Sequence, residues 1–127
     1  MHLARCGFAF DTRLANLKYV DDFDLVTILD NLLDNALEAA TVSSEKKVEL
    51  LTDHKNTYDI ITVLNSCDAP PIAKGQHLIT TKKDAKMHGL GMKSVARALK
   101  SYQGDFDWNY DPDNNQYAVT VMLSPKI

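Results

Sequence analysis

The sequence lacks an excess of positive charge, a long hydrophobic segment and a large set of cysteines. Its formal net charge is −3, whereas nucleic-acid-binding proteins usually show a basic patch or stripe, so we expect no nucleic-acid partner. No apolar run approaches the roughly 20 residues needed to cross a bilayer, and residues 1–5 lack the apolar core of a signal peptide. The length of 127 residues suits one domain with one core.

The cysteines and histidines lack the spacing of a metal site. Cys6 and Cys67 form no CxxC pair, and no two histidines stand at i, i+4 as in a zinc-binding helix. We expect two reduced, structural thiols, which fits a cytoplasmic location. A disulfide between them has no support in the sequence. The histidines are His2, His54, His77 and His88.

Two common phosphate-binding motifs are also absent. The P-loop pattern GxxxxGK[ST] does not occur, and Gly89-Leu90-Gly91 is not a dinucleotide fingerprint because Ser94 stands where the third glycine belongs. A P-loop nucleotide site and a Rossmann dinucleotide site are therefore excluded.

Helical periodicity is strongest in the first third of the chain. It predicts a helix over Asp22–Ala40, capped by Asp22 or Asp24. The apolar positions with this spacing are Leu25, Ile28, Leu29, Leu32, Leu33, Leu37 and Ala40. A second helix is predicted over Met92–Tyr102, with Gly104 able to end it.

Four segments have the alternation or β-branched content of strands. The first two are separated by Asn56-Thr57, which suggests a hairpin turn. The predicted strands are Lys47–Thr52, Tyr58–Leu64, Asp105–Tyr110 and Gln116–Leu123. The order β, α, ββ, long loop, α, ββ predicts an α+β fold, a two-layer sandwich with the helices on one face of a mixed sheet.

The long loop, Asn65–His88, contains Pro70-Pro71, Gly75 and four lysines. Loops of this length are often lids or binding loops. We expect Ser66–His88 to be the most mobile part of the domain and to become ordered with nucleotide. The alternative is a rigid loop pinned by its prolines and by a few apolar side chains, namely Ile72, Leu78 and Ile79.

Polar residues of the first predicted helix share one face. They are Asn31, Asp34, Asn35 and Glu38, at i, i+3, i+4 and i+7. An asparagine offers a neutral oxygen suited to a magnesium ion that already carries phosphates. The alternative is the ordinary wet face of an amphipathic helix, although asparagine is a poor helix former.

Three further groups of residues are candidate ligand contacts. Gly89-Leu90-Gly91 precedes the second predicted helix, where glycines let the backbone approach a phosphate and free N–H groups favour an anion; a plain turn is the alternative. The cations that precede this glycine segment either neutralise phosphate charge or are ordinary solvated side chains of a loop. Asn65-Ser66-Cys67-Asp68 ends a strand, where it either reads a base edge or makes turns. The cations are Lys82, Lys83, Lys86 and His88.

Taken together, these segments resemble the ATPase superfamily of gyrase, Hsp90, histidine kinases and MutL. Residues 28–40 resemble its N box, and the form NLLDNALEA at residues 31–39 is that of histidine kinases. Thr80-Thr81-Lys82-Lys83 resembles the lid, and residues 88–92 resemble the glycine box that follows it. The resemblance spans Asp22–Leu123 and implies a Bergerat-type ATP-binding fold.

The third motif of that superfamily departs from its pattern. Most members carry Asp-x-Gly-x-Gly, whose aspartate binds the adenine amino group. Here Asn65 occupies the aspartate position and both glycines are missing. This form is similar to the histidine kinases that sense peptide signals in Gram-positive bacteria, the quorum-sensing type.

The resemblance also implies roles for single residues. Asn35 would coordinate Mg²⁺ bridging the phosphates of ATP, and Asn31 would contact phosphate or metal from one turn earlier. Asn65 would bind adenine. Gly89-Leu90-Gly91 would let the second helix start beneath the phosphates, and Lys82 and His88 would touch phosphate when the lid closes.

The implied reaction is transfer of the ATP γ-phosphate to a histidine. The family places that histidine on a separate dimerisation region, so residues 1–127 are expected to be one catalytic domain of a longer, membrane-anchored sensor. We expect this domain to be cytoplasmic, monomeric and unable to phosphorylate itself, the whole kinase to be a homodimer, and a response regulator to be its partner.

Three other functions stay open at the level of sequence. One is a regulatory module, which either binds nucleotide without phosphotransfer or acts as a docking scaffold, and the missing glycines near Asn65 favour it. Another is a serine kinase of the anti-sigma-factor type, and the third is a gyrase- or MutL-type ATPase. The last two usually carry a glutamate where this chain has Asn31.

Overall fold

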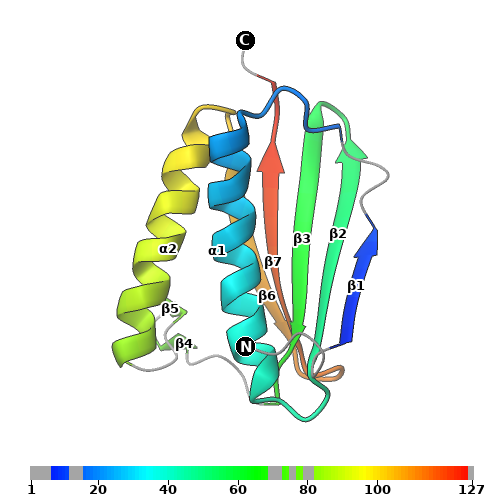
Figure 1. Cartoon of the computed structure of the whole chain (residues 1–127). Helices are drawn as coiled ribbons and strands as arrows, with labels where there is room; N and C mark the ends of the chain where they lie inside the picture. Colours follow the sequence, from blue (N-terminus) through cyan, green and yellow to red (C-terminus); the bar gives the residue numbers. More distant parts are fainter. Residues whose placement is uncertain (1–6, 12–15, 69–72, 75–76, 79–81, 126–127) are drawn as a thin grey trace.

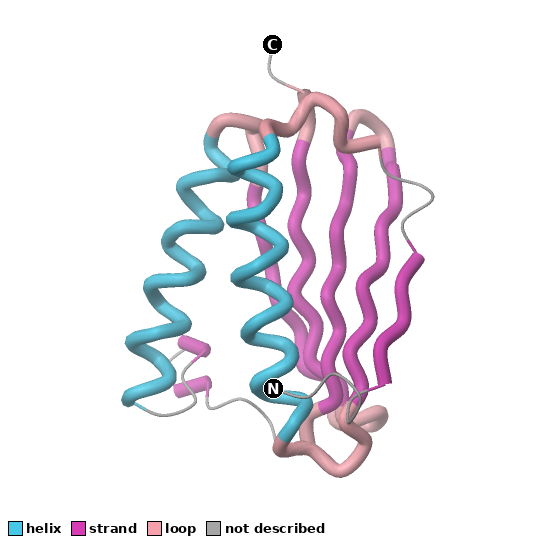
Figure 2. The backbone as a smooth tube through the Cα atoms, in the orientation of Figure 1, coloured by secondary structure: helices cyan, strands magenta, loops and turns pink. Residues whose placement is uncertain are grey.

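The computed structural model describes the backbone of residues 7–11, 16–68, 73–74, 77–78 and 82–125. Within these ranges, side chains are not described for residues 7–8, 10–11, 73–74, 77–78 and 82–90. Two helices cover one face of a five-stranded sheet (Figures 1 and 2). The elements are β1 (Gly7–Asp11), α1 (Asp22–Thr41), β2 (Lys47–Lys55), β3 (Tyr58–Ser66), β4 (Ala73–Lys74), β5 (His77–Leu78), α2 (Lys82–Lys100), β6 (Asp105–Asp111) and β7 (Gln116–Leu123).

The sheet has the order β1-β2-β3-β7-β6. β1 runs parallel to β2, and the other neighbouring strands are antiparallel. The sheet is therefore mixed, and the predicted α+β two-layer sandwich is confirmed. No helix among the described residues is long and apolar enough to span a membrane.

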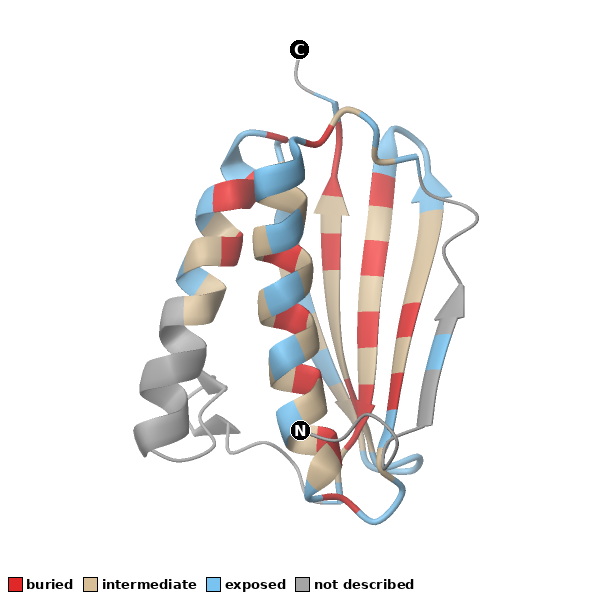
Figure 3. Ribbon diagram, viewed as in Figure 1, coloured by how far each residue is buried: buried red, intermediate tan, exposed pale blue. Residues whose placement is uncertain are grey.

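The core lies between the helices and one face of the sheet. β3 alternates buried and half-buried residues along its length (Figure 3), as expected for a strand with one covered face. α1 contributes a buried residue once per turn. The buried core residues are Ile28, Leu32, Ala36 and Ala40 from α1, Val48 and Leu50 from β2, Ile61 and Val63 from β3, Val95, Ala98 and Leu99 from α2, and Val121 and Leu123 from β7.

The start of α1 is held by a distant tyrosine, so the predicted caps are wrong. The N-cap residue is Asp21, and its side chain makes no capping hydrogen bond. Instead the backbone N–H of Asp21 donates to the hydroxyl of Tyr102 at 3.0 Å, and that hydroxyl donates to Asp24 at 2.5 Å. Tyr102 is fully buried, so it joins the end of α2 to the start of α1. Asp22 and Asp24 in the first turn still complement the helix dipole.

α2 begins at Lys82, ten residues before the predicted start at Met92. Gly89-Leu90-Gly91 therefore lies inside the helix and not ahead of it. Glycine lowers helix stability by roughly 1 kcal/mol relative to alanine, but the preceding residues 82–87 are mostly lysine, alanine and methionine, which are good helix formers. After the glycines, α2 contributes the buried residues Val95, Ala98 and Leu99 to the core.

The predicted long loop is correspondingly shorter. β3 extends through Ser66, a small antiparallel pair joins β4 to β5, and α2 takes in residues from Lys82 onward. The predicted mobile lid, Ser66–His88, includes residues 69–72, 75–76 and 79–81, which lie outside the described residues, so its mobility stays a prediction.

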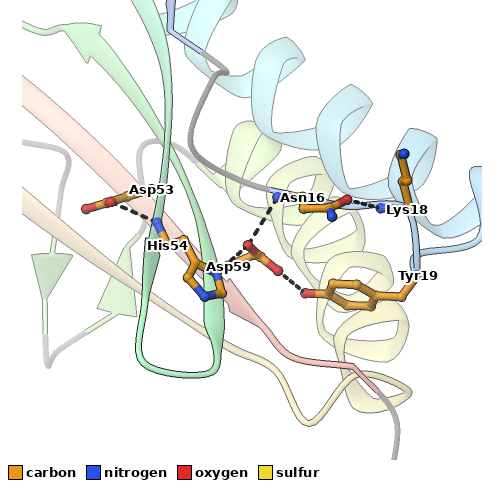
Figure 4. A network of polar contacts seen from close by, with 6 residues as sticks. All are labelled: Asn16, Lys18, Tyr19, Asp53, His54 and Asp59. Atoms are coloured by element: carbon orange, nitrogen blue, oxygen red, sulfur yellow. Dashed lines mark hydrogen bonds and ion pairs between the residues drawn. The ribbon is translucent and has the colours of Figure 1, made fainter.

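A buried carboxylate fastens the segment before α1 to the β2–β3 hairpin (Figure 4). Asp59 accepts hydrogen bonds from the hydroxyl of Tyr19 at 2.8 Å and from the backbone N–H of Asn16 at 3.2 Å. Its other close partner is the Nδ1 atom of His54, at 2.8 Å. Burial acts to raise the pKa of Asp59, but these hydrogen bonds outweigh it and hold the pKa below its ordinary value.

Candidate functional site

Asn31 lies on the side of α1 that faces α2. Its amide nitrogen donates to the carbonyl oxygen of Thr27 at 2.7 Å, one turn earlier in α1. With the nitrogen so placed, the amide oxygen of Asn31 faces α2. A Cβ atom added to Gly91 would stand 2.8 Å from that oxygen, closer than real Cβ contacts allow. The structure therefore brings together Asn31 and Gly91, two residues that sequence analysis selected independently.

This contact gives Gly91 a different role from the predicted one. Because Gly91 lies within α2, its N–H belongs to the helix and is not a free anion-binding group at a helix start. What the glycine provides is space, since the absence of a side chain lets the oxygen of Asn31 approach the α2 backbone.

The polar face predicted on α1 divides into two rows. Asn31 and Asn35 are half-buried, whereas Asp34 and Glu38 are exposed. Although Asp34 is exposed, its pKa is raised, first by the partial loss of water around its carboxylate and then by the charges of Asp30 and Glu38 one turn away on either side. The two asparagines thus form the inner row and the carboxylates the outer one.

Asn65 sits on the helix-covered face at the end of β3. It is buried, and its amide nitrogen donates to the carbonyl oxygen of Ser66 at 2.9 Å. Its neighbours across the sheet are Val48 on β2 and Tyr117 on β7. Directly opposite residues share a face of the sheet, and alternate residues along a strand do too, so Asn65 lies on the same side as the core residue Val63.

The two polar residues around Cys67 stabilise a loop. Ser66 contacts the hydroxyl of Ser43 at 2.6 Å and accepts from the backbone N–H of Lys47 at 2.8 Å. Asp68 accepts from both the backbone N–H and the hydroxyl of Ser44, each at 2.8 Å, and these bonds lower the pKa of Asp68. The turn interpretation therefore holds for Ser66 and Asp68, and Asn65 is the candidate ligand contact that remains.

Tyr117 was not among the residues predicted from the sequence. This residue is buried, and its hydroxyl has no hydrogen-bond partner among the described residues. Burial is the main cause, ahead of nearby Cys67 and Asp107, of a strongly raised pKa for the hydroxyl. Strand alternation over Gln116–Leu123 placed the ring on the core face, but an unpaired hydroxyl is a tertiary property that no local pattern signals.

These residues come from elements that meet at one end of the molecule. The end of α1, the end of β3, the start of β7 and the start of α2 all lie at the same end of the molecule (Figure 1). Lys82 is the first residue of α2, and His88, Gly89 and Leu90 follow in its first half. The side chains of residues 82–90 lie outside the described part, so the phosphate contacts expected of Lys82 and His88 stay predictions.

The donors present fit a magnesium ion that arrives with phosphates. The described residues contain no group of three or more His, Cys, Asp or Glu side chains that could hold a metal by itself. They do offer amide oxygens, from Asn31 and from Asn35 one turn later. Mg²⁺ prefers oxygen ligands and is usually held by one or two protein groups together with substrate phosphates.

Comparison with known proteins gives the family and the fold. The profile of the GHKL domain family matches residues 20–124. The catalytic domain of histidine kinase ThkA, in a nucleotide-free form, is 22% identical with a TM-score of 0.71, over 97% of this chain and 82% of that one. A second nucleotide-free form of the same domain gives 20% identity and a TM-score of 0.69, over 96% and 81%.

A longer histidine kinase shows the same fold. AdeS of Acinetobacter baumannii is 17% identical with a TM-score of 0.63, and the match covers 96% of this chain but 56% of AdeS. No curated protein matches at a significant level. At these identities the structural likenesses establish the fold alone, whereas the family match covers most of the sequence. The chain belongs to the GHKL domain family.

Proposed function

We propose that this chain is the ATP-binding catalytic domain of a two-component sensor histidine kinase. GHKL domains bind ATP, generally with Mg²⁺, and several solved structures with this fold are described as histidine kinases. The observation that carries the proposal is the close approach of Asn31 to Gly91, because it joins the predicted N box to the predicted glycine box at one place.

In the proposed reaction the γ-phosphoryl group leaves the β–γ bridging oxygen of ATP and forms a bond to a histidine nitrogen, releasing ADP. The acceptor histidine lies on a separate dimerisation domain, and a response regulator receives the phosphoryl group next. Bound Mg²⁺ neutralises charge on the phosphates. The amide oxygens of Asn35 and Asn31 would hold the Mg²⁺ that accompanies the phosphates. Asn65 would bind the adenine, and Lys82 and His88 would add positive charge.

Asn65 supports the narrower assignment to the peptide-sensing, quorum-sensing type. It stands at the end of β3, where most of the superfamily has aspartate, and the following residues Ser66 and Cys67 replace glycine-containing sequence. A neutral amide offers both a donor and an acceptor to a base edge, whereas a carboxylate offers acceptors alone.

Asn31 also weighs against the hydrolytic and serine-kinase alternatives. Both usually rely on a glutamate at this position, whereas an amide is not a general base. The nucleotide-binding module without phosphotransfer shares the entire binding site with the kinase, so an activity measurement has to separate the two.

Calorimetric titration of the folded domain with ATP tests nucleotide binding. We expect binding that weakens strongly when Mg²⁺ is replaced by EDTA. Absence of heat and of competition at millimolar ATP would refute the proposal at its base. Binding without phosphotransfer to a supplied dimerisation and histidine domain, assayed with γ-labelled ATP, would favour the regulatory module.

A further inference from the structure

The hydroxyl of Tyr117 is buried and has no hydrogen-bond partner in the part of the chain that the structure describes. It is the one buried side-chain polar atom without a partner among the described residues. Buried polar groups in folded proteins are nearly always paired, and each exception calls for a specific reason. A bound ligand is one such reason, because it supplies the partner that the unliganded protein lacks.

The ring of Tyr117 is fixed in place. It packs against Trp108 on β6, with ring centroids 6.0 Å apart and an interplanar angle of 39°. Its residue is 9% exposed, so the hydroxyl does not extend into solvent. Like any tyrosine hydroxyl, it is protonated at neutral pH and can donate one hydrogen bond and accept others. Burial raises its pKa further.

Tyr117 lies beside the residue that is assigned to the base. Tyr117 is directly opposite Asn65 in the β3–β7 pair, and the two side chains share the helix-covered face. Cys67, which follows Ser66 at the end of β3, is close enough to act electrostatically on the hydroxyl. The backbone of Cys67 is itself bound to β7, since its N–H donates to the carbonyl oxygen of Asn115 at 2.8 Å.

We propose that Tyr117 is a second base-reading residue of this site, donating a hydrogen bond from its hydroxyl to a ring nitrogen of the bound adenine. This inference rests on the proposed nucleotide-binding function. A purine edge presents a donor and acceptors in one plane, so an amide and a hydroxyl from adjacent strands provide two separate contacts to it. In this site the glycines that usually follow the adenine-binding position are missing, and the hydroxyl of Tyr117 on the neighbouring strand adds a polar contact.

The test compares two tyrosine-to-phenylalanine variants that each remove one buried hydroxyl. Tyr117→Phe removes the unpaired hydroxyl, so we expect an unchanged or higher melting temperature and about 2- to 10-fold weaker binding of Mg-ATP, the usual range for one lost hydrogen bond. Tyr102→Phe removes a hydroxyl that is bonded to Asp21 and Asp24, so we expect a lower melting temperature with unchanged affinity. Tripolyphosphate, which has no base, should bind wild type and Tyr117→Phe equally.

Each result has a defined meaning. If wild type binds Mg-ATP and Tyr117→Phe binds it equally well, this inference is wrong and the proposed function stands. If Tyr117→Phe melts at a clearly lower temperature, the hydroxyl is structural and the inference is again wrong. If Tyr117→Phe weakens tripolyphosphate as much as ATP, the hydroxyl does not read the base. If wild type binds no nucleotide, both proposals fail together.

Discussion

At the scale of single residues, Asn31 costs its helix stability and has the features of a ligand-binding residue. Asparagine in a helix interior is less favourable than alanine by about 0.7 kcal/mol. Its amide nitrogen bonds back to Thr27, a pattern that competes with ordinary helix hydrogen bonds. Its oxygen faces a glycine that leaves room for it. These features support a binding role for the inner row of α1, formed by Asn31 and Asn35.

The contact between the helices predicts the effect of Gly91→Ala. The added methyl group would stand 2.8 Å from the oxygen of Asn31, so the asparagine side chain has to move. Alanine also favours the helix by about 1 kcal/mol. We therefore expect little loss of stability but at least about a 10-fold loss of Mg-ATP affinity, measured by calorimetry and thermal melting on the same samples.

A second substitution shows whether Asn31 is the cause. Gly91→Ala combined with Asn31→Ala relieves the steric conflict, so the double variant should bind no more weakly than Asn31→Ala alone. Additive losses in affinity would mean that Gly91 acts on the ligand directly and not through Asn31.

The division of α1 into two rows predicts unequal effects of Asn35→Ala and Asp34→Ala. Asn35 is half-buried on the inner row, and alanine is the better helix former, so Asn35→Ala should remove Mg²⁺-dependent binding while the fold persists. Asp34 is exposed on the outer row and serves as the matched control, with an expected change in affinity below about 3-fold, within the range typical of exposed positions. Unfolding of Asn35→Ala, seen by circular dichroism, would instead mark Asn35 as structural.

At the scale of elements, the agreement between sequence and structure follows the strength of local patterns. The predicted helix Asp22–Ala40 matches α1 within one residue because its apolar spacing and its burial coincide. The predicted bounds of β7 are also those observed. Both elements have one face against the core, and periodicity reports this property directly.

The errors occurred where tertiary contacts decide the outcome. Gly89 and Gly91 indicated a helix start, but a glycine inside a helix also serves close packing, and the partner Asn31 is 60 residues away in sequence. The cap of α1 comes from Tyr102, which no rule for local capping finds. Asn31 and Asn65 could be proposed as site residues from sequence motifs alone, whereas placing Tyr117 opposite Asn65 required the register of the sheet.

The polar network around Asp59 predicts how stability depends on acid. Its hydrogen bonds lower the pKa of Asp59 in the folded state below the ordinary value of 3.8, so the stabilisation is fully present above about pH 4. It is lost as the pH falls through the lowered folded-state pKa. Asp59→Asn should cost about 1–3 kcal/mol at pH 7, because a buried charged acceptor is lost, and less at pH 3.

Urea unfolding of wild type and Asp59→Asn at pH 7, 4 and 3 measures this difference. Asp53→Asn is the control, since Asp53 is a half-buried carboxylate on the same hairpin that accepts from the backbone N–H of His54 at 2.8 Å and pairs with Lys55 at 4.0 Å. An Asp59→Asn difference that stays constant from pH 7 to pH 3 would contradict the expectation.

At the alkaline end, burial and Asp59 raise the pKa of Tyr19. The stabilisation that its protonated hydroxyl contributes to the fold is therefore fully present below pH 10 and is lost as the pH rises further.

At the scale of the whole molecule, the network and the candidate site lie at opposite ends of β3. Asp59 and Asn65 are six residues apart on one strand, which corresponds to about 20 Å. Sites separated by more than about 10 Å without shared partners usually act independently. The Asp59 network therefore stabilises the fold without taking part in nucleotide binding, and Asp59→Asn should leave the affinity for Mg-ATP unchanged in the folded protein.

The same separation bears on whether this domain phosphorylates itself. His54 is held by Asp59 through its Nδ1 atom, at the end of the sheet away from Asn65, so the γ-phosphate of a nucleotide bound at the candidate site lies far from it. The proposed acceptor is a histidine on a separate dimerisation domain. Incubation with γ-labelled ATP should therefore leave the isolated domain unlabelled and label a supplied histidine domain, and light scattering should give the monomer mass of 14.2 kDa. Stable label on His2, His54, His77 or His88 would show that the chain contains its own acceptor, and the separate acceptor domain would then have to be abandoned. A dimer mass would contradict the expected monomer and show that the domain has dimer contacts of its own.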